Sequence, residues 1–181
     1  MAVVLRAALF FLLCSVPAAA QELVPLPERG SDGLWVEDWF RVSAGDLRAD
    51  LAAASAEGRI LAIFWERPGC QYCELLHLEA LREPSLRDFV ARHFYAVRFR
   101  RYGRDPVVGF DGVVRTEEQL AVRHAVIGTP TIEFRIADNS EVYRIPGYAS
   151  APVLLAVFEY VQLGAYLHTS IVDWLVARGL M

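Results

Sequence analysis

The chain has 181 residues and a formal net charge of −4, and all 18 of its basic residues are arginine. This acidic balance excludes a general nucleic-acid-binding protein, which needs an excess of positive charge. The length suits one domain with its own hydrophobic core.

Residues 1–20 have the composition of a secretory signal peptide. A short basic start leads into an almost wholly apolar run, Leu5 to Val16, and three small residues end at Ala20. This order predicts export with cleavage after Ala20, which also removes Cys14. The apolar run is too short to span a bilayer comfortably, so we expect no stable membrane insertion after cleavage. Leu13 stands where a lipoprotein needs a small residue before Cys14.

The exported chain divides into a lead-in and one domain. Residues 21–43 are predicted to be a flexible lead-in, because prolines and glycines interrupt residues 21–33. The aromatic-rich run Leu34–Phe40 is expected to pack onto the domain. Residues 44–181 are predicted to form that domain and to end in an additional C-terminal helix.

Helical and strand patterns alternate along this domain. The predicted helices begin after Asp46, at Cys70, at the capping box that starts with Thr116, near Val153, and after Thr169 or Ser170. The predicted strands are Ile60–Trp65, Phe94–Phe99, Ile132–Ile136 and Glu141–Ile145. Pro84 should break or kink the second helix, and residues 100–115 resemble an inserted loop. This order predicts an α/β fold, with a mixed central sheet, helices on both faces and a C-terminal helical extension.

The two cysteines of the exported chain lie in the motif Cys70-Gln71-Tyr72-Cys73. A structural disulfide would normally close a longer loop, so we interpret the pair as redox-active, with no metal or other cofactor. The pair begins a helix, where unpaired N–H groups and the helix dipole stabilise a thiolate. We therefore expect Cys70 to be exposed and to attack a partner's disulfide. Cys73 should be buried and should resolve the mixed disulfide.

Two other interpretations of the cysteine pair remain. A zinc site would use both cysteines and His77, with His93 or His124 as the fourth ligand, although structural zinc usually needs a second close pair. The pair could also form a purely structural disulfide. A c-type haem is excluded because Glu74 stands where that motif needs histidine. We interpret His77 as a packed or solvated residue rather than a catalyst.

Three sequence segments resemble a known group of proteins. The segment Phe64–Cys73, followed later by Gly128-Thr129-Pro130-Thr131, is similar to the thioredoxin superfamily. Residues 144–148, Arg-Ile-Pro-Gly-Tyr, and the helix after them resemble the periplasmic SoxW/SoxS-type thioredoxin-like proteins associated with sulfur-compound oxidation. The resemblance covers residues 44–165 and implies a thioredoxin fold and a periplasmic thiol–disulfide oxidoreductase.

The resemblance also assigns roles to individual residues. It implies that Cys70 is the nucleophile and that Cys73 is the resolving cysteine. Pro130 matches the family's cis-proline, and the Thr129 backbone before it meets the substrate chain as a strand. Gln71-Tyr72 replaces the Gly-Pro of thioredoxin, so thioredoxin's reduction potential does not transfer to this chain.

One acidic residue is a candidate for proton transfer. Thioredoxin keeps a buried acid on the strand before its cysteines, and the matching position here is Phe64. Glu66 is the nearest acid, and two interpretations of it stand equally. It is either a proton acceptor for Cys73 or a solvated carboxylate at the strand end.

The residues and the resemblance together favour a reductase of protein thiols or disulfides. The expected partner is a sulfur-oxidation component, and a membrane thiol transporter is expected to recharge the protein with electrons. A disulfide oxidase or isomerase for secreted proteins is the alternative within the same chemistry. A non-catalytic module that binds extended peptides is the alternative of another class. The sequence does not show whether residues 100–115 contact the partner.

Overall fold

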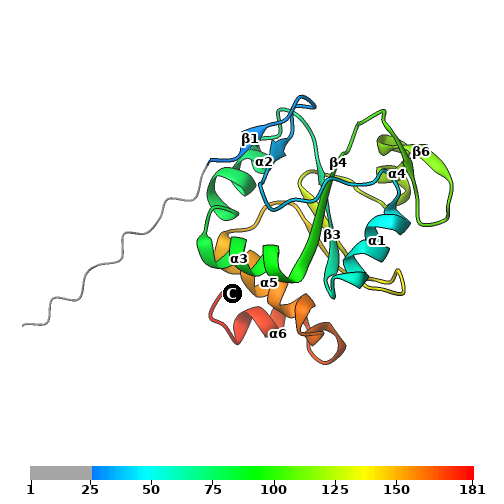
Figure 1. The fold of residues 1–181 in the computed structure, drawn as a ribbon. Helices are drawn as coiled ribbons and strands as arrows, with labels where there is room; N and C mark the ends of the chain where they lie inside the picture. The colour runs from blue at the N-terminus through cyan, green and yellow to red at the C-terminus, as the bar shows by residue number, and fades with distance from the viewer. Residues whose placement is uncertain (1–25) are drawn as a thin grey trace, which may run out of the picture.

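The computed structural model describes residues 26–181, so the predicted signal peptide lies outside the described residues. At its centre is a four-stranded mixed sheet with strand order β4-β3-β7-β8 (Figure 1). Strand β3 is parallel to β4 and antiparallel to β7, which is antiparallel to β8. The strands are β3 (Ile60–Glu66), β4 (Phe94–Arg100), β7 (Thr131–Arg135) and β8 (Glu141–Pro146).

Helices cover both faces of the sheet, as the sequence predicts. One face packs against α1 and α4, and the other packs against α3 and α5 (Figure 1). Successive side chains of a strand point to opposite faces. Strand β3 therefore sends Ile63 and Trp65 into the α1/α4 core and Ala62 and Phe64 into the α3/α5 core. The helices are α1 (Leu47–Ala56), α3 (Pro84–His93), α4 (Glu117–Arg123) and α5 (Ala151–Gln162).

The local signals for helix ends are confirmed. Asp46 caps α1 by accepting a hydrogen bond from the Arg48 backbone N–H at 2.9 Å. Thr116 and Gln119 form the predicted capping box of α4. Pro84 is the first residue of α3 and so separates this helix from the one before it.

The helix after the cysteines changes its geometry partway along. It begins as α2 (Gln71–Leu75) and continues as a π-helical turn over Leu76–Ala80. The Leu81 N–H donates to the Leu76 carbonyl at 2.8 Å, a spacing of five residues. Such π-turns are rare and frequently occur at functional sites.

The prediction of a flexible lead-in is wrong for the part that the structure describes. Strands β1 (Glu28–Arg29) and β2 (Trp35–Val36) pair as an antiparallel hairpin, and Gly33 takes the positive φ that the turn between them needs. The Phe40 ring lies 4.8 Å from the Phe64 ring, as expected of an aromatic run that packs onto the domain. Gly30 and Gly33 lie in the turn of this hairpin and are joined there by a backbone hydrogen bond.

Residues 100–115 also differ from the predicted loop. Strands β5 (Pro106–Val108) and β6 (Val114–Thr116) form a second antiparallel hairpin. The Val108 N–H donates to the Gly45 carbonyl at 2.9 Å, and Val107 is buried in the α1/α4 core. The glycines and the proline of this segment indicated a loop, but the segment forms two strands of three residues each.

The C-terminal extension is helical, as predicted. A 3₁₀ turn, Ala165–Leu167, precedes α6 (Ile171–Val176), and the Ser170 hydroxyl caps α6. The Trp174 indole N–H donates to the Ala156 carbonyl of α5 at 2.7 Å, which attaches the extension to the domain. Within residues 26–181, no helix has the length and apolar character needed to cross a bilayer.

Candidate active site

The two cysteines are joined by a disulfide at the beginning of α2. Cys70 is the N-cap residue, and its sulfur accepts a hydrogen bond from the Cys73 backbone N–H at 3.1 Å. Cys73 is 1% exposed and Cys70 only 5%, so the prediction of an exposed Cys70 is wrong for the disulfide form. The reason is that the sulfur of Cys70 is covered by the loop before β7.

That loop brings Thr129 onto the disulfide. The Thr129 hydroxyl donates to the Cys70 sulfur at 3.3 Å, and the Thr129 carbonyl oxygen lies 3.5 Å from the same atom. The Thr129–Pro130 peptide bond is cis. Ile127, which precedes Gly128 in this loop, is 91% exposed. The sequence-predicted residues Cys70, Thr129 and Pro130 therefore lie together, with Cys70 and Pro130 buried and Thr129 partly exposed.

The two residues between the cysteines face solvent. Gln71 and Tyr72 are both exposed, and the Tyr72 ring stacks 6.5 Å from that of Tyr148. Their side chains lie beside the disulfide rather than between it and the core. They are therefore available to a partner that approaches Cys70.

Glu66 is not a solvated carboxylate. Its side chain is fully buried, and its Oε1 atom lies 2.8 Å from Nε2 of His77. Its Oε2 atom is also buried and has no hydrogen-bond partner. Strand alternation explains the burial, because Glu66 follows Ala62 and Phe64 on the face that packs against α3 and α5. Of the two interpretations of Glu66, the solvated carboxylate is wrong, and the role as proton acceptor stays a prediction.

His77 connects Glu66 to a second carboxylate. Its Nδ1 atom lies 2.8 Å from Oε1 of Glu37, which follows β2 and is 5% exposed. Burial disfavours the imidazolium, but the charge of Glu66 and the hydrogen bonds to both glutamates outweigh it and raise the pKa of His77 to about 9. The imidazole is therefore charged at neutral pH and donates a hydrogen bond to each carboxylate.

Sequence reasoning missed this network of three residues. His77 is one helical turn after Cys73, but the pattern does not distinguish a packed histidine from a paired one. Glu37 lies 40 positions before His77 in the sequence, and no motif links them. The only available signal was Glu66 itself, because a carboxylate at the end of a fully apolar strand needs a partner if the strand end is buried.

A second buried network occupies the opposite face of the sheet. Glu133 of β7 is fully buried and accepts hydrogen bonds from the Trp65 indole at 3.2 Å, His124 at 2.9 Å and Arg135 at 2.5 Å. In the structure, His124 therefore pairs with Glu133, and His77 pairs with Glu37 and Glu66, instead of binding zinc. His93 packs against Phe89, and within residues 26–181 no three His, Cys, Asp or Glu side chains are arranged to hold a metal ion.

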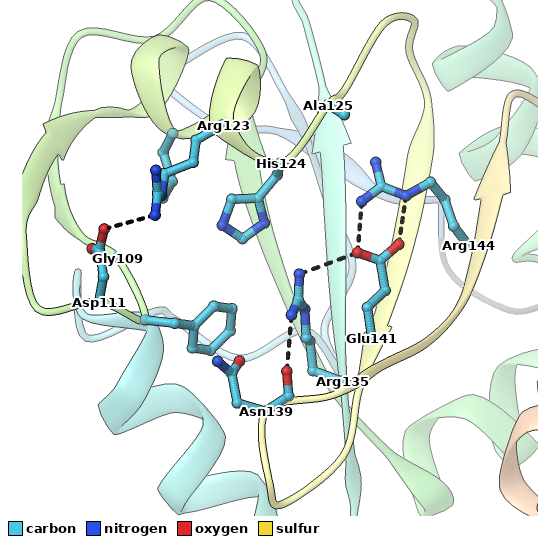
Figure 2. Close-up of a pocket in the computed structure, with 11 residues that line it drawn as sticks. Gly109, Asp111, Arg123, His124, Ala125, Arg135, Asn139, Glu141 and Arg144 are labelled. Atoms are coloured by element: carbon cyan, nitrogen blue, oxygen red, sulfur yellow. Dashed lines mark hydrogen bonds and ion pairs between the residues drawn. The ribbon is translucent and has the colours of Figure 1, made fainter.

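The second network borders a cleft of about 850 Å³ (Figure 2). In Figure 2, Arg123 pairs with Asp111 at one end of the cleft and Arg144 pairs with Glu141 at the other, with His124 between them. Neither cysteine lines this cleft. Its charged side chains are paired with one another, so we place the redox site at the disulfide.

Comparison with known proteins agrees with this geometry. The family described as thioredoxin-like domain matches residues 47–162. A thioredoxin-fold protein from Helicobacter pylori has 26% sequence identity and a TM-score of 0.57, over 67% of this chain and 80% of that chain. A thioredoxin from Thermus thermophilus, at 23% identity and a TM-score of 0.53, covers 67% of this chain and 86% of its own, and shows the same fold. No curated protein matches the sequence.

Proposed function

Because the chain belongs to the thioredoxin-like domain family, we propose that it is a thiol–disulfide oxidoreductase that works through Cys70 and Cys73. The position of the disulfide carries this proposal. The Cys70 sulfur receives hydrogen bonds from the Cys73 N–H and the Thr129 hydroxyl at the positive end of a helix. Each of these features stabilises a thiolate, which is the attacking species in disulfide exchange.

The exchange has two steps in this proposal. The Cys70 thiolate attacks a partner's disulfide, forms a mixed disulfide and releases the first partner thiolate. The Cys73 sulfur then attacks Cys70, which closes the disulfide and releases the second partner thiolate with the electron pair of the broken bond. The partner is reduced by two electrons and the protein is oxidised by two. Glu66, with its unpartnered buried oxygen, accepts the proton that Cys73 loses.

The partner's chain lies against the Thr129 backbone in this proposal, with its sulfur beside Cys70. An extended peptide can pair there with main-chain groups next to Pro130, which is how many domains bind a strand. Gln71 and Tyr72 are exposed beside the same place and would contact the partner's side chains. Protein thiols and disulfides are therefore the proposed substrate class.

We further propose a cellular role that the sequence supports. The signal-like residues 1–20 and the SoxW/SoxS-type motifs favour a periplasmic reductase of a sulfur-oxidation component, recharged by a membrane thiol transporter. The reduction potential of the Cys70–Cys73 pair tests the direction in which electrons flow between this protein and its partner. A value well below that of the periplasmic oxidants supports a reductase, and a value near theirs supports an oxidase.

The assignment of the two cysteines is tested by trapping. The Cys73→Ser protein cannot complete the second step, so it should accumulate a mixed disulfide through Cys70, detected by non-reducing electrophoresis and mass spectrometry. Cys70→Ser should trap none. The proposal fails if the two variants behave in the reverse way, or if neither forms a mixed disulfide with a disulfide-containing protein.

A further inference from the structure

The N-terminal hairpin lies against the active-site loop, although it precedes the part of the chain that matches the family. A Cβ atom at Gly33 would lie 3.2 Å from the ring of Pro68, which is two residues before Cys70. Arg29 pairs with Glu74 of α2 at 3.4 Å. Figure 1 shows the hairpin beside α2. The hairpin therefore contacts both the loop and the helix that hold the disulfide.

The hairpin also supplies a buried charge. Glu37, directly after β2, accepts the Nδ1 hydrogen of His77 at 2.8 Å. The rings of Trp35 and Phe40 lie 6.4 and 5.9 Å from the imidazole and help to cover it. The hydrogen bond from Nδ1 of the buried His77 to Glu37 fixes the orientation of the imidazole ring.

The hydrogen bonds of the three residues leave one buried acceptor without a partner. The His77 imidazolium has two N–H groups, and each is directed at Oε1 of one glutamate. This leaves Oε2 of Glu66 buried without a partner. This oxygen is therefore free to take a hydrogen bond or a proton from a donor that reaches it.

We propose that His77 and Glu37 are positioning residues, which hold Glu66 so that its free Oε2 atom takes the proton of Cys73 during the second exchange step. The N-terminal hairpin is then part of the active site. This inference rests on the proposed function. The proton passes from the Cys73 thiol to Glu66 as the Cys73 sulfur bonds to the Cys70 sulfur. The bond between Cys70 and the partner breaks, and the partner leaves as a thiolate.

Ellman's reagent (5,5′-dithiobis(2-nitrobenzoate)) separates the two steps in the reduced full chain. Attack by Cys70 releases one thionitrobenzoate, and attack by Cys73 on the mixed disulfide releases the second, so rapid mixing should resolve two phases. Glu66→Gln should leave the first phase intact and slow the second by about 100-fold, the contribution expected of a general base.

Two substitutions at one position separate positioning from packing. His77→Gln places an amide nitrogen near the Nε2 position and can keep the contact with Glu66. His77→Asn places it near the Nδ1 position, keeps the contact with Glu37 and loses the one with Glu66. We expect Asn to slow the second phase by about tenfold and Gln by less than about threefold. Glu37→Ala should lie between them.

The pH profile and a matched control complete the experiment. The charged groups that act on the imidazole within residues 26–181 are Glu37 and Glu66. With His77→Asn the second phase should rise by about tenfold per pH unit, since solvent must then remove the proton, whereas the wild type should depend less on pH. His124→Asn, on the opposite face, should leave both phases and their pH profiles unchanged.

The outcomes distinguish the inference from the function on which it rests. If the reduced wild-type protein does not release thionitrobenzoate in two resolved phases, the proposed function fails. If the wild type shows both phases but both His77 variants and Glu37→Ala resolve at its rate with its pH profile, the positioning role is wrong. Equal slowing by His77→Gln and His77→Asn, with an unchanged pH profile, would also overturn it, because packing alone would then account for the effect.

Discussion

Each face of the central sheet buries a glutamate beside a histidine, but the two glutamates differ in how completely they are paired. On the α1/α4 face, Glu133 receives hydrogen bonds from Trp65, His124 and Arg135. On the α3/α5 face, Glu66 receives one hydrogen bond, from an imidazole, and its second oxygen has no partner. Both carboxylates are fully buried, so exposure does not explain the difference.

We interpret the difference as one between an acid that stabilises the fold and an acid that we propose takes part in proton transfer. Burial alone would raise the pKa of Glu133, but the hydrogen bond and charge of His124 and the charge of Arg135 outweigh burial and lower it. Both oxygens of Glu133 are thus paired with hydrogen-bond donors. One oxygen of Glu66 has no donor, and Glu66 belongs to the strand that leads directly to Cys70. Incomplete pairing of a buried acid is therefore the feature that distinguishes the face on which we propose the proton transfer.

Removing Glu133 should give the largest loss of stability. Glu133→Ala leaves the Trp65 indole N–H and the Arg135 guanidinium without their buried partner, so the free energy of unfolding should fall by about 3–5 kcal/mol. Both phases of thionitrobenzoate release should keep their rates in protein that remains folded. Denaturant unfolding followed by tryptophan fluorescence measures the first effect. A loss below about 1 kcal/mol would contradict a structural role for this network.

The network on the other face should make stability depend on alkaline pH. The folded pKa of His77, about 9, lies above its ordinary 6.5, so folding takes up a proton between these values. The stabilisation is complete below pH 6.5 and is lost as pH rises through about 9. The shift corresponds to a fall of roughly 3 kcal/mol in the free energy of unfolding of the oxidised protein. Denaturant titrations at several pH values measure this fall.

Variants decide whether His77 causes the loss. His77→Gln should remove most of the pH-dependent fall, because the glutamine amide does not titrate. His124→Asn should retain it. If His77→Gln shows the same fall in the free energy of unfolding as the wild type, other groups cause the pH dependence. The assignment of a charged His77 is then wrong.

Local patterns in the sequence were sufficient to predict the fold and to locate the disulfide. Asp46 and the capping box at Thr116 mark helix starts through hydrogen bonds to residues two or three positions away. The spacing of Cys70 and Cys73 after an apolar strand locates the disulfide by the same kind of short-range information. Each of these features is decided within one helical turn, which is why a single sequence reveals it.

The surroundings of the disulfide depend on long-range packing and were not predictable in the same way. Glu37 reaches His77 only because the hairpin folds back onto α2, and no periodicity encodes that approach. The position of Glu66 at a strand end left a proton acceptor and a solvated carboxylate equally open, because the contact with His77 of the π-turn has no local signal. Side-chain pairing across distant segments follows from tertiary structure and leaves no local signal.

The smallest expected effect separates the hairpin's packing from its buried charge. Arg29→Gln removes the Arg29–Glu74 ion pair, whose side chains are 45% and 49% exposed, so solvent screens most of its energy. We expect a change below about 0.5 kcal/mol in the free energy of unfolding and no change in the second phase of thionitrobenzoate release. If Arg29→Gln slowed that phase as much as Glu37→Ala does, the hairpin would act by holding α2 in place. The effect of the hairpin on the second phase would then come from its surface contact with α2 and not from the buried Glu37 carboxylate. An unchanged rate, beside a slower one for Glu37→Ala, assigns the hairpin's effect to the carboxylate that it buries.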